Sequence, residues 1–520
     1  MKKTIVLISL CAFMAAAMPT FAFGPTSVLI TPPAPKFTDA ERHAELAKRR
    51  AAVAAKMADK SVLILFSAEP KLYTNDVDYV YRQENNLYYL TALKQNGATL
   101  VITKNGGTVT ETLFLPKRVP VQEIWNGKMY SREQAMSASG LKNLVDSSER
   151  AAFFTALKEK KAFASKENVS IGAGAENVYL LLPESDRDRD GMREFAVENT
   201  FSKELAGYKV ENAQPIFAEL RLIKSPYELK LLQHAVDIST EAHMRAMATI
   251  GRAKWEYEVH AEVEYTFRRR NADNWGYPSI VGCGPNATTL HYVESQGEVK
   301  KGEVLLMDAA AEYEHYTADI TRTFPANGKF TKEQAEIYQI VFDAQEAVAK
   351  ATKPGVRYGQ LNTIARNVIN EGLFKLGLVT DKASQQSSIW FMHGLGHWIG
   401  MNVHDVGDYA LPLQAGMVFT NEPGIYIRED ALDNLPDTPE FKAFKEKVRP
   451  VFEKYKNIGV RIEDDMLVTE TGVEWMSGKL PRTIADIEAF MAVAPKTVPV
   501  SQRYKQNNER YTFGQTLAIR

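Results

Sequence analysis

The stretch Leu305–Pro325, "LLMDAAAEYEHYTADITRTFP", has the pattern of two strands joined by a turn. Asp308 ends an apolar run that is typical of a buried strand, and Asp319 follows eleven residues later in a second strand-like run. The residues from about Glu312 to His315 are expected to form the turn between the two strands. An antiparallel return would bring both carboxylates together if they share a face of the sheet.

Two buried carboxylates need positive charge beside them, because desolvating an unpaired one costs on the order of several kcal/mol. Arg322 could neutralise one of them, whereas a metal ion could neutralise both. Further acids lie in equally apolar contexts, Glu422 in "VFTNEPGIY" and Glu463 in "VRIEDDMLV". Asp464 and Asp465, which follow Glu463, are expected to face water.

Histidine is scarce in this chain, yet three of its nine histidines fall within "HGLGHWIGMNVHDVG". His397, in this motif, completes a set of five candidate ligands. Four carboxylates and one imidazole suit Mn²⁺, Fe²⁺, Co²⁺ or Zn²⁺ and argue against Cu(I) or an iron–sulfur cluster. Four negative charges match two divalent ions, which we expect about 3.5–4 Å apart with a hydroxide nucleophile between them. The candidate ligands are Asp308, Asp319, His397, Glu422 and Glu463.

Each candidate has a simpler explanation when it is taken alone. A single Asp or Glu at a strand end is usually solvated or salt-bridged. A single histidine is more often a hydrogen-bonded buried side chain than a ligand. The metal hypothesis therefore depends on the five residues together.

The first part of the chain alternates strand and helix patterns. A helix is expected at Asp39–Met57 and a strand at Ser61–Ala68, and Ala98–Pro116 has the pattern of a hairpin that turns at Asn105–Gly107. Similar alternation continues to about residue 215. We therefore predict an N-terminal α/β domain over residues 23–215.

A second domain begins at a helix start signal. Ser225, Pro226 and Glu228 form a capping-box pattern, and the helix is expected to end near Thr249. Strand-like runs then alternate with further helices, which predicts an α+β domain with a largely antiparallel sheet over residues 216–493. The other expected helices run from about Lys254, from a cap at Thr331, and over Tyr358–Leu376; Glu429–Asn457 reads as a charged insertion between two strands.

Five motifs resemble, in order, those of aminopeptidase P and prolidase, which are pita-bread metallopeptidases. They are "LHYVES", "MDAAAEYEHYTADITRTFPANGKFT", "MHGLGHWIGMNVHDVG", "NEPGIY" and "GVRIEDDMLVTETG". The resemblance covers Glu219–Met491 strongly and reaches more weakly into the first domain. It implies an α/β N-terminal domain that caps the cleft and mediates oligomers, followed by a pita-bread catalytic domain with a curved sheet. Arg82 and Trp125 lie in the most family-like parts of the first domain, where core packing or a surface salt bridge would also explain them.

The resemblance implies a role for each candidate ligand. Asp308 would bind one metal ion through both oxygens, and Asp319 and Glu463 would bridge the two ions. His397 and Glu422 would bind the second ion. Glu422 would also accept a proton from the attacking water.

The resemblance also assigns residues that contact the substrate. His404 would steady the tetrahedral intermediate, and His291 would be its partner at the scissile carbonyl. His393 would contact the substrate as well. Arg461, just before the bridging glutamate, would order the ligands around the metal ions.

The implied activity is an exopeptidase with two divalent ions that hydrolyses N-terminal Xaa-Pro bonds of peptides. We favour Mn²⁺, while Zn²⁺, Co²⁺ and Fe²⁺ remain compatible with the ligands. Prolidase, an Xaa-Pro dipeptidase, is the alternative, although "TRTFP" and an export signal favour the aminopeptidase. A non-catalytic pita-bread binding protein is a remote alternative, because such proteins typically lose metal ligands.

Both ends of the chain carry further expectations. "MKKTIVLISLCAFMAAAMPTFA" has a charged start, an apolar stretch and a small-residue site, which predicts a secretory signal peptide over residues 1–22 and export to a periplasm or the medium. Only Cys283 would remain after cleavage, so no intramolecular disulfide is expected. The polar tail, residues 494–520, has no assigned role. A net charge of −1 favours neither nucleic acid nor a membrane surface, and the resemblance implies a homo-oligomer, either a dimer or a tetramer.

Overall fold

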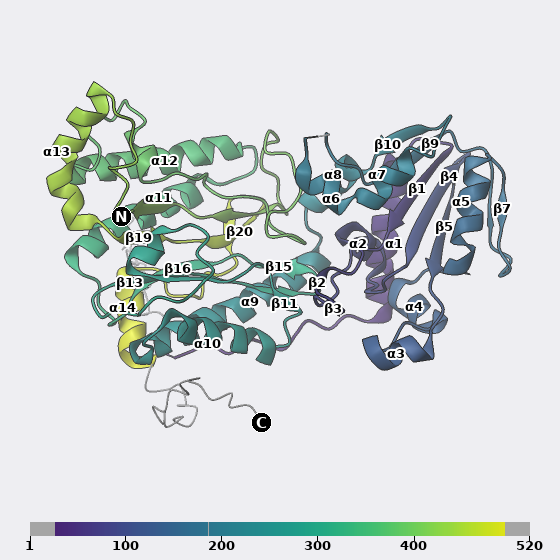
Figure 1. The fold of residues 1–520 in the computed structure, drawn as a ribbon, viewed down its shortest axis with the longest axis horizontal. Helices are drawn as coiled ribbons and strands as arrows, with labels where there is room; N and C mark the ends of the chain where they lie inside the picture. The colour runs from purple at the N-terminus through teal and green to yellow at the C-terminus, as the bar shows by residue number, and fades with distance from the viewer. Residues whose placement is uncertain (1–26, 186, 495–520) are drawn as a thin grey trace, which may run out of the picture.

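The computed structural model describes residues 27–185 and 187–494. The expected signal peptide and almost all of the expected tail lie outside these residues. Figure 1 shows two parts side by side along the longest axis, one built on β1, β4 and β5 and the other on α9 to α14. Within the described residues, no helix is long and apolar enough to cross a membrane.

The N-terminal part is an α/β domain, as predicted. Its six-stranded sheet has the order β10-β9-β1-β4-β5-β6, with antiparallel pairs in the centre and parallel pairs toward both edges. The hairpin turns at Gly106 and Gly107, whose φ angles of 56° and 79° suit glycine. The strands are β1 (Ser61–Phe66), β2 (Leu72–Thr74), β3 (Val77–Asp78), β4 (Thr99–Asn105), β5 (Thr108–Leu115), β6 (Asn143–Asp146), β7 (Phe163–Ala164), β8 (Ser170–Ile171), β9 (Asn177–Leu180) and β10 (Lys209–Asn212).

Helices cover both faces of this sheet, because its central strands are apolar on both sides. Leu63 and Leu65 of β1 belong to the cluster that includes Val53 of α1, whereas Val62 and Ile64 pack with the cluster around α5. The helices of this part are α1 (Asp39–Lys56), α2 (Asn85–Thr91), α3 (Pro120–Asn126), α4 (Arg132–Ser139), α5 (Arg150–Lys158), α6 (Arg189–Glu194), α7 (Ala196–Ser202) and α8 (Gln214–Leu222).

The second part combines helices with small antiparallel sheets, which confirms the α+β prediction. Each strand pair in it is antiparallel, in the orders β12-β13-β16, β11-β14-β15, β17-β20-β21 and β18-β19. The strands are β11 (Asn274–Trp275), β12 (Ile280–Cys283), β13 (Val304–Asp308), β14 (Ala311–Tyr313), β15 (Tyr316–Thr317), β16 (Thr321–Pro325), β17 (Val418–Asn421), β18 (Gly424–Ile427), β19 (Ile458–Arg461), β20 (Asp464–Val468) and β21 (Val473–Trp475).

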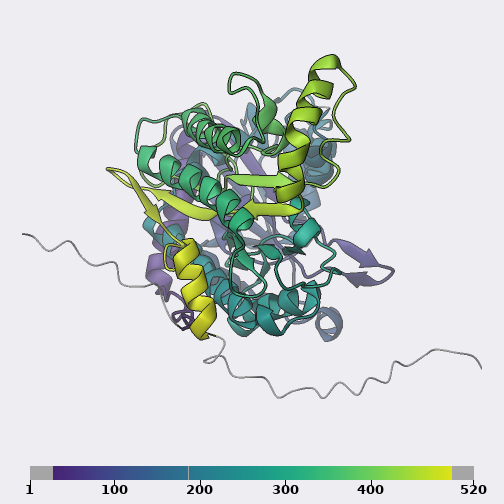
Figure 2. The same ribbon diagram turned by 90° about the vertical axis from the view of Figure 1, so that its left-hand side faces the viewer.

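Local caps set the helix boundaries. The Ser225 hydroxyl accepts a hydrogen bond from the Glu228 backbone, and the Glu228 carboxylate accepts one from Ser225 in return, so the helix starts where the capping box predicts. The expected insertion is mostly one helix, α13, which follows β18 and precedes β19 in the sequence and projects at the edge of the molecule in Figure 2, while the two strands pair with each other. The helices are α9 (Pro226–Thr249), α10 (Glu256–Arg269), α11 (Lys332–Ala351), α12 (Tyr358–Leu376), α13 (Pro439–Tyr455) and α14 (Ile484–Val493).

The predicted turn between Asp308 and Asp319 is confirmed, but it contains a second hairpin. β13 pairs with β16, with Asp308 opposite Thr321, and the short strands β14 and β15 form a hairpin between them. This inner hairpin turns at Glu314 and His315, which both have left-handed backbone angles. Asp319 therefore lies two residues away from the direct partner of Asp308.

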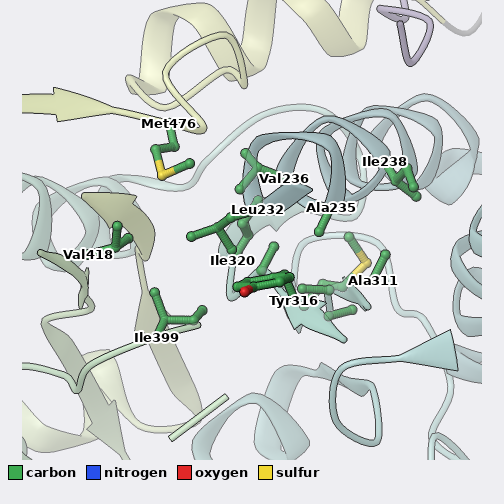
Figure 3. Packing of buried hydrophobic residues seen from close by; sticks show 14 of the residues in the cluster. Leu232, Ala235, Val236, Ile238, Ala311, Tyr316, Ile320, Ile399, Val418 and Met476 are labelled. Atoms are coloured by element: carbon green, nitrogen blue, oxygen red, sulfur yellow. The ribbon is translucent and has the colours of Figure 1, made fainter. Parts of the chain in front are cut away.

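The inner hairpin packs against α9 in the main hydrophobic core. Figure 3 shows Leu232, Ala235 and Val236 of α9 beside Tyr316 and Ile320. Burial of each large apolar side chain contributes about 1.5–3 kcal/mol. The same core therefore holds in place the backbone that leads to Asp319.

The structure corrects two expectations about the charged residues near Glu463. Arg322 is fully buried and donates to Asp464 Oδ1 at 2.6 Å and to the Glu463 carbonyl, so its ionic partner is neither Asp308 nor Asp319. Asp464 and Asp465 do not face water; both are fully buried, because β20 lies between β17 and β21. The Arg322 charge is thus not available to the two carboxylates of the opening stretch.

We expect Arg322→Met to destabilise the fold strongly, by about 3–5 kcal/mol, because it leaves Asp464 buried without its cation. Thermal and denaturant unfolding would measure the change. Arg449→Met removes an exposed partner of Asp433 and should change stability little. Equal effects of the two substitutions would contradict this account of Arg322.

Candidate metal centre and substrate cleft

One cavity of about 480 Å³ collects every residue that the sequence nominated for the site. The five candidate ligands line it, and so do the candidate substrate contacts and the arginine next to Glu463. The nominated residues in its wall are His291, Asp308, Asp319, His393, His397, His404, Glu422, Arg461 and Glu463.

The five candidate ligands come from the ends of strands that are far apart in the sequence. Asp308 ends β13, and Asp319 stands between β15 and β16. Glu463 stands between β19 and β20, and Glu422 follows β17. His397 is held beside β17, since its backbone N–H donates to the Thr420 hydroxyl. The ends of strands from three separate sheets thus converge on one cavity.

The candidate ligands lie within the reach of shared metal ions. Asp319, His397 and Glu463 each offer a ligand atom, and these atoms lie within 4.8 Å of one another. His397 Nε2 lies 3.2 Å from Asp319 Oδ2 and 3.4 Å from Glu422 Oε1. An imidazole and several carboxylate oxygens at such distances fit a divalent transition metal.

One carboxylate oxygen in this group fits a cation as its partner. Glu463 Oε2 accepts a hydrogen bond from Thr321 at 2.6 Å, but Glu463 Oε1 is buried and has no hydrogen-bond partner among the described residues. An unsatisfied buried carboxylate oxygen is costly. The nearest cation is Arg461, whose Nη2 already donates to Asp308 Oδ2 at 2.5 Å. The residues therefore fit bound divalent metal ions.

The pKa values of the candidate ligands also indicate a site that is suited to metal ions. Burial raises the pKa of Glu422 to about 7, and burial together with the neighbouring acid Asp319 raises the pKa of Glu463 well above its usual range. Burial also raises the pKa of Asp308. Burial opposes the charged form of His397, but the hydrogen bond to Asp319 outweighs it and raises the pKa of His397 to about 9. Raised pKa values favour bound protons in the metal-free site, and metal ions would compete with those protons for the same ligands.

Tyr277 is a site residue that the sequence did not reveal. Its hydroxyl lies 2.5 Å from Asp308 Oδ1 and 2.6 Å from Asp319 Oδ1, inside the same cavity. The signal that could have found it is strand register, because Ile280 pairs with Asp308 and Tyr277 precedes that strand by only a few residues. No local motif marks this tyrosine.

Arg461 links the carboxylates to the other side of the cleft. Its guanidinium donates to Asp308, to the Thr321 hydroxyl at 3.0 Å and to the Tyr426 hydroxyl at 2.8 Å. The Tyr426 hydroxyl lies 2.8 Å from His393 Nε2. A continuous set of polar contacts thus runs from Asp308 to His393.

Two of the three cleft histidines are neutral near pH 7. Burial lowers the pKa of His393 to about 3, and burial with the neighbouring His397 lowers the pKa of His404 to about 4. The His404 ring contacts the His397 ring, with centroids 4.2 Å apart. His291 lines the same cavity. Neutral imidazoles can donate a hydrogen bond to a carbonyl oxygen without adding a charge.

Comparison with known proteins places this geometry in a family. The profile "Metallopeptidase family M24" matches residues 230–470, and "Aminopeptidase P, N-terminal domain" matches residues 46–164. An "Xaa-Pro aminopeptidase" of Haemophilus influenzae is 35% identical over 86% of this chain and 97% of its own length. The chain belongs to the aminopeptidase P family. The resemblance and the predicted fold class are thereby confirmed.

Solved structures and other relatives of the aminopeptidase P family agree. Aminopeptidase P from Escherichia coli, with the inhibitor Pro-Leu, matches with a TM-score of 0.75 and 32% identity, covering 89% of this chain and all of that one. An "Xaa-Pro dipeptidase" of Homo sapiens is 30% identical over 93% of this chain and 98% of its own length. The chain is thus a metalloaminopeptidase, a hydrolase that binds divalent metal ions. The boundary near residue 215 stays a prediction, as do the individual site roles.

We expect the metal-free protein to lose stability as the pH rises from 7 to 9. The pKa of His397 is about 9 in the folded protein, above its ordinary value of 6.5, so folding is favoured while this proton is bound and the gain is lost as it leaves. The loss should be up to about 3 kcal/mol. Melting curves of chelator-treated protein would measure it.

His397→Asn is the control, since it removes this titration and should flatten the pH dependence. Added Mn²⁺ should stabilise the wild type more at pH 9 than at pH 7, because metal and proton compete for the same imidazole. A wild-type melting temperature that does not fall over this range would contradict the prediction.

Proposed function

We propose that the chain removes the N-terminal residue from peptides whose second residue is proline. The observation that carries the proposal is the single cavity that holds all five candidate ligands together with three histidines. The names and the full-length coverage of the aminopeptidase relatives support this substrate class. The bond before proline has no N–H and carries a rigid ring, so it needs a dedicated site.

The cleft has an apolar portion that suits a proline ring. Apolar side chains lie in the same cavity wall as the acids, so a ring could bury its carbon atoms while the bond before it faces the metal ligands. The apolar wall residues are Pro278, Ile280, Leu290, Val293 and Val403.

We infer two divalent ions, held by Asp308, Asp319, His397, Glu422 and Glu463 in the roles given above. Mn²⁺ is our preferred metal, and Zn²⁺, Co²⁺ or Fe²⁺ fit the same ligands. When bound, such ions lower the pKa of a coordinated water and polarise a carbonyl. The chain's own residues do the rest of the chemistry.

Glu422 is the proposed proton acceptor for the attacking water. Its carboxylate lies in the cavity wall beside His397, and its elevated pKa brings it close to the working pH of a general base. His404 and His291 are proposed to donate hydrogen bonds to the carbonyl oxygen as negative charge develops on it. His393, held by Tyr426, would form a side of the substrate pocket.

A preference for Xaa-Pro dipeptides is the second candidate specificity, because a human Xaa-Pro dipeptidase also matches nearly the whole chain. The "TRTFP" motif and the expected export signal favour the aminopeptidase. A non-catalytic binding protein is disfavoured, since all five candidate ligands are present and face one cavity.

We further propose export and self-association. The first 22 residues would be removed as a signal peptide, leaving the protein in a periplasm or the medium. Trp125 is 82% exposed, which excludes core packing, and Val121 and Ile124 on the same short helix are exposed too. An exposed apolar group of this kind supports assembly into a dimer or tetramer.

We expect activity to depend on metal and on peptide length. After complete removal of metal by a chelator, activity should fall to background, and Mn²⁺ should restore it better than Co²⁺ or Zn²⁺. An Xaa-Pro-Xaa tripeptide should have a kcat/KM at least about 10-fold above that of the Xaa-Pro dipeptide, equivalent to about 1.4 kcal/mol. A preference for the dipeptide would identify a prolidase instead. Full activity in verified metal-free protein would contradict the metal mechanism.

We expect His404→Ala to lower kcat about 10²–10³-fold, as loss of an oxyanion donor does. Metal content, measured by elemental analysis, should stay nearly unchanged. Asp319→Asn is the comparison, because it should lose both metal and activity. Loss of metal from His404→Ala would show that His404 has another role.

A further inference from the structure

The position of His404 depends on the backbone of its loop. This segment, Gly400–Asp405, is here called the His404 loop; it forms neither helix nor strand. Across residues 27–185 and 187–494, no group hydrogen-bonds to the His404 imidazole, whose ring contact is with His397. Because no hydrogen bond fixes the imidazole, its position depends mainly on the backbone of the loop.

The N-terminal domain holds this loop directly. Arg82 Nη2 donates to the Met401 carbonyl oxygen at 2.7 Å. Asn85 Nδ2 donates to Asn402 Oδ1 at 2.7 Å. Both donors precede or begin α2, more than 300 positions away in the sequence. These bonds join the first domain to residues only two or three positions before His404.

Arg82 is itself fixed by hydrogen bonds to two further residues. Its Nε donates to Glu312 Oε2 at 2.8 Å, and its Nη1 donates to Asn85 Oδ1 at 2.9 Å. Glu312 is 5% exposed and belongs to the inner hairpin that leads to Asp319. One guanidinium therefore connects the start of α2, this hairpin and the His404 loop. A planar guanidinium suits this role because its several N–H groups can donate to different acceptors at once.

The far end of the His404 loop is held from the same side. The Asp405 carboxylate pairs with Arg221 of α8, and Lys224 Nζ lies 3.6 Å from its other oxygen. Arg221 Nη1 also donates to Asn86 Oδ1 at 2.8 Å. Arg221 and Asp405 are 2% and 7% exposed, so these contacts are shielded from water. Residues 82–86 thus brace both ends of the loop.

We propose that Arg82 is a positioning residue for His404 and that residues 82–86 make the N-terminal domain a working part of the catalytic site. Arg82 does not line the cavity. It acts by fixing the backbone from which His404 extends. A displacement of about 1 Å at a reacting group can cost on the order of 10²-fold in rate. The inference rests on the proposed function, through the role of His404.

A double-mutant cycle tests the proposal on the metal-loaded enzyme. Arg82→Met should lower kcat for the Xaa-Pro tripeptide about 10–100-fold, with KM within about 3-fold and metal content unchanged. In a His404→Ala background, Arg82→Met should lower kcat by less than about 2-fold, because the residue that it positions is gone. Losses that multiply in the double variant would overturn the proposal. Arg82→Lys should recover activity in part, because an ammonium cannot reach all of the acceptors.

Hydrogen exchange of the metal-loaded proteins gives a readout that does not depend on activity. Amides in residues 399–406 should exchange faster in Arg82→Met than in the wild type. Arg150→Met is the matched control, since Arg150 bonds to Thr99 in the N-terminal sheet; it should change neither loop exchange nor kcat. Unchanged exchange in Arg82→Met would overturn the proposal.

The two hypotheses fail in different ways. A metal-loaded wild type that does not cleave the tripeptide contradicts the proposed function. An active wild type whose kcat survives Arg82→Met contradicts only the role of Arg82.

Discussion

An excess of buried negative charge over buried positive charge is the constraint on which this protein depends. Four carboxylates line one cavity, and the cationic side chains beside them are Arg461 and, while it is protonated, His397. Arg322, the other nearby arginine, is committed to Asp464. A fold that leaves such an imbalance is stable only with protons or metal ions in the site. The same charge imbalance that destabilises the metal-free protein therefore favours the binding of divalent cations.

The two domains contribute different things to the site. The antiparallel sheets bring strand ends together and so collect the candidate ligands, while α9 packs behind the inner hairpin that carries the chain to Asp319. The N-terminal domain adds hydrogen bonds to the His404 loop, which the second domain also holds, since the Thr317 N–H donates to the Gly400 carbonyl oxygen at 2.9 Å. The sheets of the second domain thus position the candidate ligands. The position of His404 depends on hydrogen bonds from both domains.

Features encoded locally could be predicted well from the sequence. The helices Pro226–Thr249 and Tyr358–Leu376 have the expected limits because caps and periodicity act over a few residues. The turn at Glu314 and His315 followed from the spacing of two acids. The candidate ligands were recognised from short sequence motifs, and the structure places all five in the wall of one cavity.

The ionic partners of Arg322 and Arg82, and the position of Tyr277, escaped prediction because they depend on strand register and domain contact. Asp464 looked solvated for the same reason: its sequence neighbours do not reveal that strands cover it on both sides.

The order of the ligands along the chain has a consequence for biosynthesis. Asp308 is made early in the second domain, whereas Glu463 belongs to the last strands to emerge. A site that needs all five candidate ligands is therefore incomplete until Glu463 has been synthesised and the last strands have paired. Non-local sheet contacts form slowly, which lengthens the time before the site is complete.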